Sequence, residues 1–252
     1  MKKFKGFFKS FICCACLLGL APLRLPAPSS GTLGAPSSGT YKAETLTYRE
    51  VEGEITVIHT ITITHAPPGY RIELASQRTV GGTVRQTFRT AADLSTLAWS
   101  FSDPGRQMEL DARMQGEAVI LSGSLRGRPL ANEFKTGDLA WNQLFQIGME
   151  PIVISGETEF KFCSIGTEGP GELKMGKFTA TRENEEMIQL GGKETAAVHL
   201  RVSLSGLLSI FWHGDYWYRK SDGRFLRFRG KNRPSGPVAV LELIAERPDE
   251  AR

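Results

Sequence analysis

Few side chains in this chain could carry acid–base chemistry. It contains four histidines, His59, His65, His199 and His213, and only His213 has a carboxylate close behind it, at Asp215. A carboxylate can hold an imidazole in place for general-base catalysis. No motif ties a serine or cysteine nucleophile to this pair, so a hydrolase using His213 and Asp215 ranks third among three functional hypotheses.

The familiar catalytic signatures are missing from the sequence. It has no phosphate-binding Gly-x-x-x-x-Gly-Lys-Ser/Thr loop, no His-Glu-x-x-His zinc motif and no Gly-x-Ser-x-Gly elbow. Cys163 is the only cysteine after residue 16, so it has no nearby partner for a metal site or a disulfide, and we expect a small buried apolar residue. We therefore predict no cofactor, no metal and no assigned catalytic residue.

His59 lies in the clearest strand pattern of the chain, residues 54–64. Ile55, Val57, His59 and Ile61 fall on one face, and threonines occupy most of the other. This period of two is typical of a half-buried β-strand. On an apolar face, His59 is either a hydrogen-bonded core histidine or a polar group lining an internal cavity.

Similar alternation recurs from residue 41 onward, and Gly and Pro turn signals separate the runs about every ten residues. Such spacing predicts a mainly β fold, a curled antiparallel sheet or partly open barrel of about 10–12 strands. We expect one domain over residues 41–246 and a disordered tail over residues 247–252.

One segment, around residues 139–147, has a helical pattern instead. Asp138 can cap it, Gly148 can end it in the left-handed conformation, and Pro151 would block its continuation. Its apolar stripe consists of Ala140, Trp141, Leu144, Phe145 and Ile147. A single amphipathic helix among strands is expected to pack in the concave face of the curled sheet.

A hairpin is predicted around Asp222-Gly223, a pair that favours a two-residue type I′ turn. Centring the turn there places Trp217 opposite Phe228 on a core-facing side. The other side then carries aromatic and basic residues: Tyr216, Tyr218, Lys220, Arg227 and Arg229. This face is either simply solvated or contacts anionic groups such as lipid phosphates.

The N-terminus determines the expected location. A basic start followed by a short apolar run makes residues 1–21 a secretory signal peptide or an uncleaved N-terminal anchor. Acylation at Cys16, as in a lipoprotein, is a further alternative. The repeated Ala-Pro-Ser-Ser-Gly-Thr of residues 22–40 is typical of a linker. We expect export to the periplasm or cell envelope.

The positive net charge belongs to this leader rather than to the domain. Residues 1–40 contain five of the 31 basic residues and none of the 27 acidic ones, which leaves the remainder close to neutral. The charge therefore gives no argument for a nucleic-acid partner.

The C-terminal part resembles a known family. The runs Ala197–Gly206, Phe211-Trp212 and Asp215–Phe228 are similar to exported bacterial proteins catalogued as domain of unknown function 3108. The resemblance implies a curved antiparallel sheet, broadly like that of envelope lipoprotein carriers. That family has no defined activity, so the resemblance implies no catalytic residues.

The leading hypothesis is a non-enzymatic envelope protein that binds an apolar or lipid-like ligand in the concave face of its sheet. Its candidate ligand-binding residues are Ile55, Val57, His59, Ile61, Trp141 and Phe145. The alternative is a structural or interaction module that contacts a membrane surface or an envelope protein through strand edges or the basic hairpin.

Overall fold

The computed structural model describes residues 43–78, 82–167, 172–210, 212–232 and 236–248. The predictions for residues 1–40, and for the tail beyond residue 248, lie outside these ranges. The first eight strands are β1 (Ala43–Glu52), β2 (Ile55–Ala66), β3 (Gly69–Arg78), β4 (Thr83–Thr90), β5 (Thr96–Asp103), β6 (Met108–Gln115), β7 (Ala118–Leu125) and β8 (Arg128–Lys135). The others are β9 (Ala140–Trp141), β10 (Glu159–Thr167), β11 (Leu173–Leu190), β12 (Lys193–Leu204), β13 (His213–Arg219), β14 (Phe225–Lys231) and β15 (Val238–Pro248). The helices are α1 (Phe145–Gly148) and α2 (Glu150–Ser155), with 3-10 turns η1 (Pro104–Arg106) and η2 (Gly206–Ile210).

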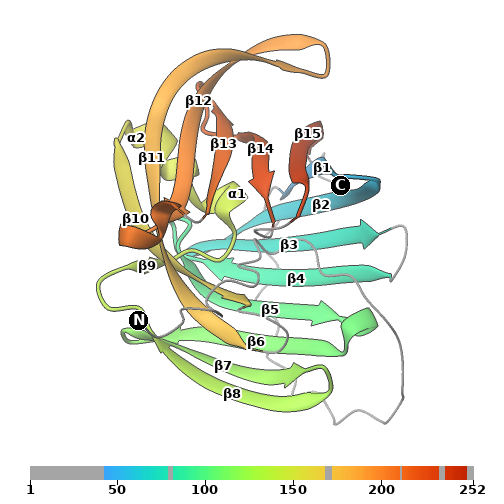
Figure 1. Ribbon diagram of the computed structural model, residues 1–252, viewed down its shortest axis with the longest axis vertical. Helices are drawn as coiled ribbons and strands as arrows, with labels where there is room; N and C mark the ends of the chain where they lie inside the picture. The colour runs from blue at the N-terminus through green and yellow to red at the C-terminus, as the bar shows by residue number, and fades with distance from the viewer. Residues whose placement is uncertain (1–42, 79–81, 168–171, 211, 233–235, 249–252) are drawn as a thin grey trace, which may run out of the picture.

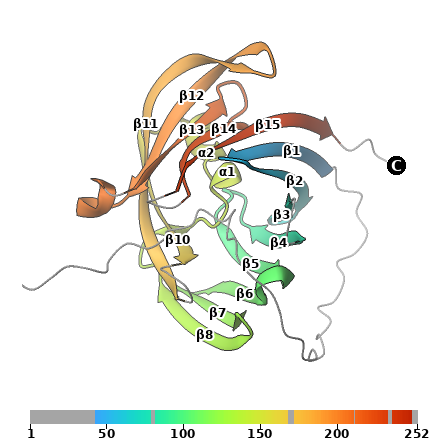
Figure 2. The same cartoon turned by 45° about the vertical axis from the view of Figure 1, so that its right-hand side comes forward.

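All fifteen strands belong to one sheet, in the order β8-β7-β6-β5-β4-β3-β2-β1-β15-β14-β13-β12-β11-β10-β9. Neighbours are antiparallel except β9 and β10, which are parallel. Two meanders are thus joined where β1 pairs with β15, and the sheet curls on itself (Figures 1 and 2). The predicted curled antiparallel fold is confirmed, with more strands than expected, and β15 continues through Pro248 into the predicted tail.

The curl follows from alternation and from bulges. On β2 the apolar face is buried at Val57 and Ile61, whereas Thr60 and Thr62 on the other face are half-buried. The pairing shifts register at four places, where an extra residue lies in β5, β11, β14 or β15. Because a bulge bends its strand and increases the local twist, these shifts help the sheet to close around an interior.

The predicted helix is displaced along the chain. Ala140 and Trp141 form β9 rather than a helical turn, and the helices begin only at Phe145. Pro151 does not block the helix, because it lies in the first turn of α2, where a proline is tolerated. We call residues 144–155, which contain α1 and α2, the plug. Figure 2 shows both helices inside the curl, so the predicted placement in the concave face is confirmed.

Gly148 is required for packing rather than for its backbone angle. It is not among the glycines with positive φ, and the left-handed residue that ends the plug is Gly156, at φ 77°. A Cβ atom on Gly148 would lie 2.1 Å from Oδ1 of the buried Asn142. The end of α1 is thereby packed tightly against the segment that follows β9.

The predicted register of the C-terminal hairpin is wrong. Tyr216 lies opposite Phe228, and Trp217 lies opposite Arg227. The loop is longer than a type I′ turn, because the Gly223 N–H donates to the Arg219 carbonyl and the Arg219 N–H donates to the Arg224 carbonyl. Only Gly223 has positive φ, whereas a type I′ turn needs it at two residues.

Replacing Gly223 with valine should lower the free energy of unfolding by about 2 kcal/mol. The residue has φ 73°, and a Cβ atom would lie 2.9 Å from the Glu150 carbonyl oxygen and 3.1 Å from the Ile154 side chain. Urea unfolding followed by circular dichroism measures the loss. Gly191→Val is the control for backbone strain alone, since its Cβ would meet nothing within 4 Å; equal losses for both would contradict the packing argument.

Candidate functional site

A buried chain of polar side chains crosses the concave face of β1, β2 and β3. His59 Nε2 lies 2.8 Å from Glu50 Oε2, and His59 Nδ1 lies 2.8 Å from Ser76 Oγ. An ionised carboxylate can only accept, so Nε2–H donates to Glu50 and Nδ1 faces the Ser76 hydroxyl. Both ring nitrogens therefore have partners, and His59 is a hydrogen-bonded core histidine.

Asn232, just after β14, extends this chain of contacts. Its Nδ2 donates to Glu50 Oε1 at 2.8 Å and to Glu52 Oε2 at 3.2 Å. The serine, histidine and carboxylate are the residue types of a hydrolase triad. Ser76, however, is only 2% exposed, so a substrate carbonyl has no access to its hydroxyl in this structure. The contacts instead connect β1, β2, β3 and the end of β14.

Replacing His59 with leucine should lower the free energy of unfolding by about 2–3 kcal/mol, because a buried carboxylate and a buried hydroxyl each lose a partner. Thermal and urea unfolding give the value. His213→Leu serves as the control, because His213 is exposed, and it should change stability by less than about 0.5 kcal/mol. A His59→Leu protein as stable as the wild type would contradict the argument.

Asp215 pairs with a different histidine from the predicted one. Its Oδ1 lies 3.0 Å from His199 Nε2 and 3.2 Å from Arg201 Nε, both on the neighbouring strand β12. His199 is stacked on Trp217, with ring centroids 4.8 Å apart. These side chains lie on the outer face, away from the plug, so the structure gives no support to a dyad of His213 and Asp215.

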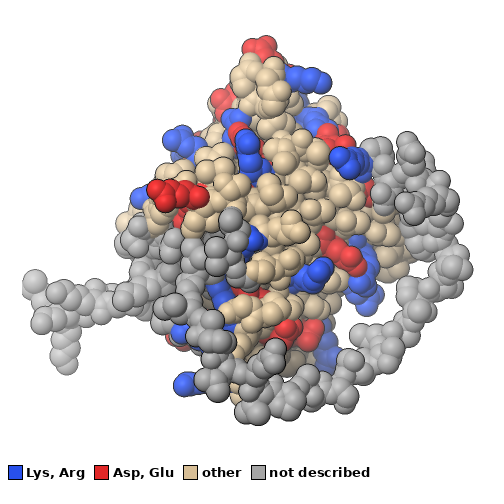
Figure 3. Space-filling model, turned by 90° about the vertical axis from the view of Figure 1, so that its right-hand side faces the viewer, with Lys and Arg blue, Asp and Glu red and all other residues tan. Residues whose placement is uncertain are grey.

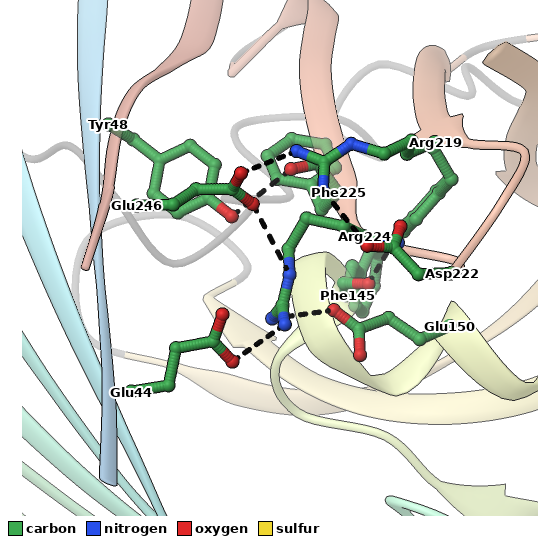
Figure 4. A network of polar contacts seen from close by, with 10 residues as sticks. Glu44, Tyr48, Phe145, Glu150, Arg219, Asp222, Arg224, Phe225 and Glu246 are labelled. Carbon is green, nitrogen blue, oxygen red and sulfur yellow. Dashed lines mark hydrogen bonds and ion pairs between the residues drawn. The ribbon is translucent and has the colours of Figure 1, made fainter. Parts of the chain in front are cut away.

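A second polar cluster lies where the plug meets the C-terminal hairpin, and Figure 4 shows it. Arg224 Nη2 lies 2.6 Å from Glu44 Oε2 on β1, and Nη1 lies 3.4 Å from Glu150 Oε1 on α2. Its Nε lies 3.7 Å from Glu246 Oε1 on β15 and is buried without a hydrogen-bond partner. We call Glu44, Glu150, Arg224 and Glu246 the Arg224 cluster.

Arg219 extends the negative side of this cluster toward solvent. Its Nη2 bonds Glu246 at 2.6 Å and its Nη1 bonds Asp222 at 2.9 Å. Burial, opposed by Arg224, raises the pKa of Glu150 to about 8. Burial also raises the pKa of Tyr48 well above its ordinary value, and its hydroxyl donates to the Phe225 carbonyl at 3.2 Å. The cluster therefore holds a carboxyl group that titrates near neutral pH.

The predicted ligand-binding residues lie in two separate groups. Val57, His59 and Ile61 are buried on the concave face of β2, and Ile55 is half-buried at the start of that strand. Trp141 and Phe145 lie in the other half of the molecule. The Phe145 ring is 4.9 Å from that of Phe162 and 5.3 Å from that of Phe178, so aromatic side chains fill this part of the interior.

The predicted aromatic and basic face of the hairpin does not form. Tyr216 and Tyr218 are fully buried, because they share the inward-facing side of β13, whose alternation is regular, and the extra residue of the bulge, Leu226, lies on β14. Lys220 pairs with Glu185, and Arg227 bonds Glu242 and the Gln189 carbonyl, while Arg229 is exposed. Carboxylates therefore offset much of the basic charge, and contact with anionic groups stays a prediction. Figure 3 shows blue and red side chains interspersed on the face it presents.

Sequence reasoning did not identify Glu50, Ser76 or Glu150. For Glu50 a signal was present, because it continues the inward alternation of Leu46 and Tyr48. Ser76 likewise shares the parity of Ile72 and Leu74. Glu150 had no such signal, because its partner Arg224 comes from the distant loop between β13 and β14.

Within the described ranges, no group of three or more His, Cys, Asp or Glu side chains is arranged to hold a metal ion. None of the helices in the described residues has the length and apolarity needed to cross a membrane.

Comparison with solved structures finds matches at low sequence identity. A β-barrel-like protein of domain of unknown function DUF1849 from Brucella abortus matches with a TM-score of 0.56 at 7% identity, covering 83% of this chain and 98% of the other. The hypothetical lipoprotein YmcC from Escherichia coli matches with a TM-score of 0.37 at 7% identity, covering 83% and 90%. A DUF1329 family protein from Desulfovibrio piger matches with a TM-score of 0.31 at 11% identity, covering 84% and 87%.

The first of these matches shows a shared β-barrel-like fold. No protein-family model and no curated protein sequence matches the chain. The resemblance to domain of unknown function 3108 is therefore not confirmed.

Proposed function

We propose that this is an exported, non-enzymatic protein of the cell envelope that binds an apolar or lipid-like ligand against the concave face of its sheet. The basic and apolar pattern of residues 1–21 supports the location. The burial of Ser76 and the outer position of Asp215 argue against the hydrolase hypothesis.

One observation carries the proposal: two short helices, and not a second sheet, lie inside the curl, and the first meander presents a broad apolar concave wall to this interior. The wall extends over β1 to β7 through the buried residues Leu46, Ile61, Ile72, Phe88, Trp99, Leu110 and Leu121. The plug that lies inside the curl is only twelve residues long (Figure 2). Acyl chains gain about 25 cal/mol for each Å² of apolar surface they bury, so they could bind to this wall inside the curl.

The polar chain of Glu50, His59 and Ser76 adds a second supporting feature. It lies on the same concave face as the wall, beside Val57 and Ile61. Ligand sites are mostly apolar with a few placed polar groups that set the orientation of the ligand. An amphiphile with a polar end and an apolar chain fits this combination better than a purely polar ligand does.

Titration with the fluorescent apolar probe 1-N-phenylnaphthylamine tests the proposal. We expect saturable binding by the wild-type protein. Ala112→Trp, which adds bulk on the concave face of β6, should weaken binding about tenfold or more, in line with the 1.4 kcal/mol that a factor of ten represents.

The matched control is Ala131→Trp, because Ala131 is exposed on the edge strand β8. It should bind the probe like the wild type, and circular dichroism should show that both variants are folded. Absence of saturable binding, or equal affinities for the two tryptophan variants, would contradict the proposal.

A further inference from the structure

The C-terminal hairpin makes several of the contacts that hold the plug in place. The Tyr218 hydroxyl donates to the Phe145 carbonyl at 2.8 Å, and Gly223 packs directly on the backbone of Glu150. Arg224 then reaches Glu150 at the start of α2. The hairpin thus contacts the plug through the Tyr218 hydroxyl on β13 and through Gly223 and the Arg224 guanidinium in the loop.

The same guanidinium also bonds the opposite side of the interior. Glu44 comes from β1 and Glu246 from β15, the pair of strands that joins the two meanders. Arg224 is therefore the one residue of the cluster that contacts the plug, the first meander and the second meander together (Figure 4). Moving α2 outward would separate Glu150 from this shared cation.

We propose that the Arg224 cluster is a proton-controlled latch, in which protonated Glu150 docked beside Arg224 keeps the plug inside the curl and ionised Glu150 releases it. The inference rests on the proposed function for its purpose, because an opened plug would admit the apolar ligand. The latch itself can be tested without any ligand.

Burial of the Glu150 carboxyl, followed by the charges that face it, explains why ionisation would release it. Glu44 from β1 and Asp222 from the hairpin loop oppose its negative charge, while Arg224 and the Phe225 N–H favour it. Glu246 and Arg219 complete the surroundings, and they pair with each other at 2.6 Å. A third carboxylate charge around one arginine is disfavoured in a site with little water.

The direction of the pH effect follows from linkage. The pKa of Glu150 is about 8 in the closed structure, against an ordinary value of 4.5 that it would regain on release. The contribution of protonated Glu150 to the stability of the closed plug is therefore fully present below pH 4.5 and is lost as the pH rises through about 8. Opening of the plug should increase by about tenfold or more between about pH 6 and about pH 9.

Hydrogen exchange measured by mass spectrometry tests this, with exchange times scaled for the base-catalysed intrinsic rate. In the wild-type protein, peptides from residues 144–155 should lose protection between about pH 6 and about pH 9 by about tenfold or more, while peptides from β4 to β6 should not. Glu150→Gln, a neutral mimic of the protonated acid, should abolish this loss. Glu157→Gln, an exposed position just after α2, should retain it.

If protection of residues 144–155 in the wild type did not change with pH, or if Glu150→Gln showed the same pH response as the wild type, the latch would be overturned. The association rate of 1-N-phenylnaphthylamine separates this failure from that of the proposed function. With both correct, the rate rises with pH in the wild type and is flat in Glu150→Gln. If the plug opens with rising pH but the protein binds no probe, the latch is supported and the ligand proposal is rejected. If the probe binds at a pH-independent rate and protection stays constant, the ligand proposal is supported and the latch is rejected.

Discussion

Replacing Arg224 with methionine is expected to lower the free energy of unfolding by about 3–5 kcal/mol. Methionine has a similar length but no charge, so Glu44 and Glu150 would lose the guanidinium that they share, while Glu246 would keep Arg219. Removal of the partner of a half-buried carboxylate costs more than loss of a fully exposed pair, because the remaining charge keeps part of its desolvation penalty.

Urea denaturation near neutral pH measures this loss. Arg229→Met on the same hairpin is the matched control, because Arg229 is exposed on β14, and it should change stability by less than about 0.5 kcal/mol. A loss below about 1 kcal/mol for Arg224→Met would mean that the cluster does not hold β1, β15 and the plug together.

Replacing Phe145 with alanine should also cost about 3–5 kcal/mol. The ring packs edge-on against Phe162 and Phe178, and it lies 6.3 Å from the ring of Tyr216. These neighbours belong to β10, β11 and β13, so the sheet cannot close the cavity without moving several strands at once.

Ile154 provides the control within the same plug. Its side chain is 68% exposed, so Ile154→Ala should alter stability by less than about 0.5 kcal/mol. Thermal and urea unfolding of both variants give the comparison. Similar small losses for Phe145→Ala and Ile154→Ala would show that the plug contributes little to the folded state.

Much of the fold could be predicted because alternation is a local property. The pattern of Val57, His59 and Ile61 marks a strand and its buried face without reference to any partner strand. Curling of the sheet followed from many short antiparallel strands. The number of strands did not follow, because short edge elements such as β9, Ala140–Trp141, have no pattern of their own.

The turn of the C-terminal hairpin and the start of the helix could not be predicted from local sequence patterns. An Asp-Gly pair permits a two-residue turn, but a longer loop lets Gly223 pack on Glu150, and that contact depends on the position of the plug. Trp141 matches a helical stripe equally well, yet its segment pairs with β10. In both places tertiary contacts outweighed the local preference.

The candidate site was predictable only in part for the same reason. His59 could be found on an apolar face, and the parity of β1 and β3 could have placed Glu50 and Ser76 beside it. The Arg224 cluster could not be assembled, because Glu44 and Arg224 are brought together only when β1 and the hairpin meet. Pairing of His199 with Asp215 likewise depends on the register of β12 and β13.

Native mass spectrometry tests the central claim most directly. The protein would be produced with its full N-terminal segment in a host that exports it, and purified without detergent. The account predicts a population whose mass exceeds that of the chain by one lipid-like molecule, which is released on collisional activation and is reduced in Ala112→Trp relative to Ala131→Trp. A single unliganded species in the wild type, at both acidic and alkaline pH, would contradict the claim that the concave face binds such a ligand.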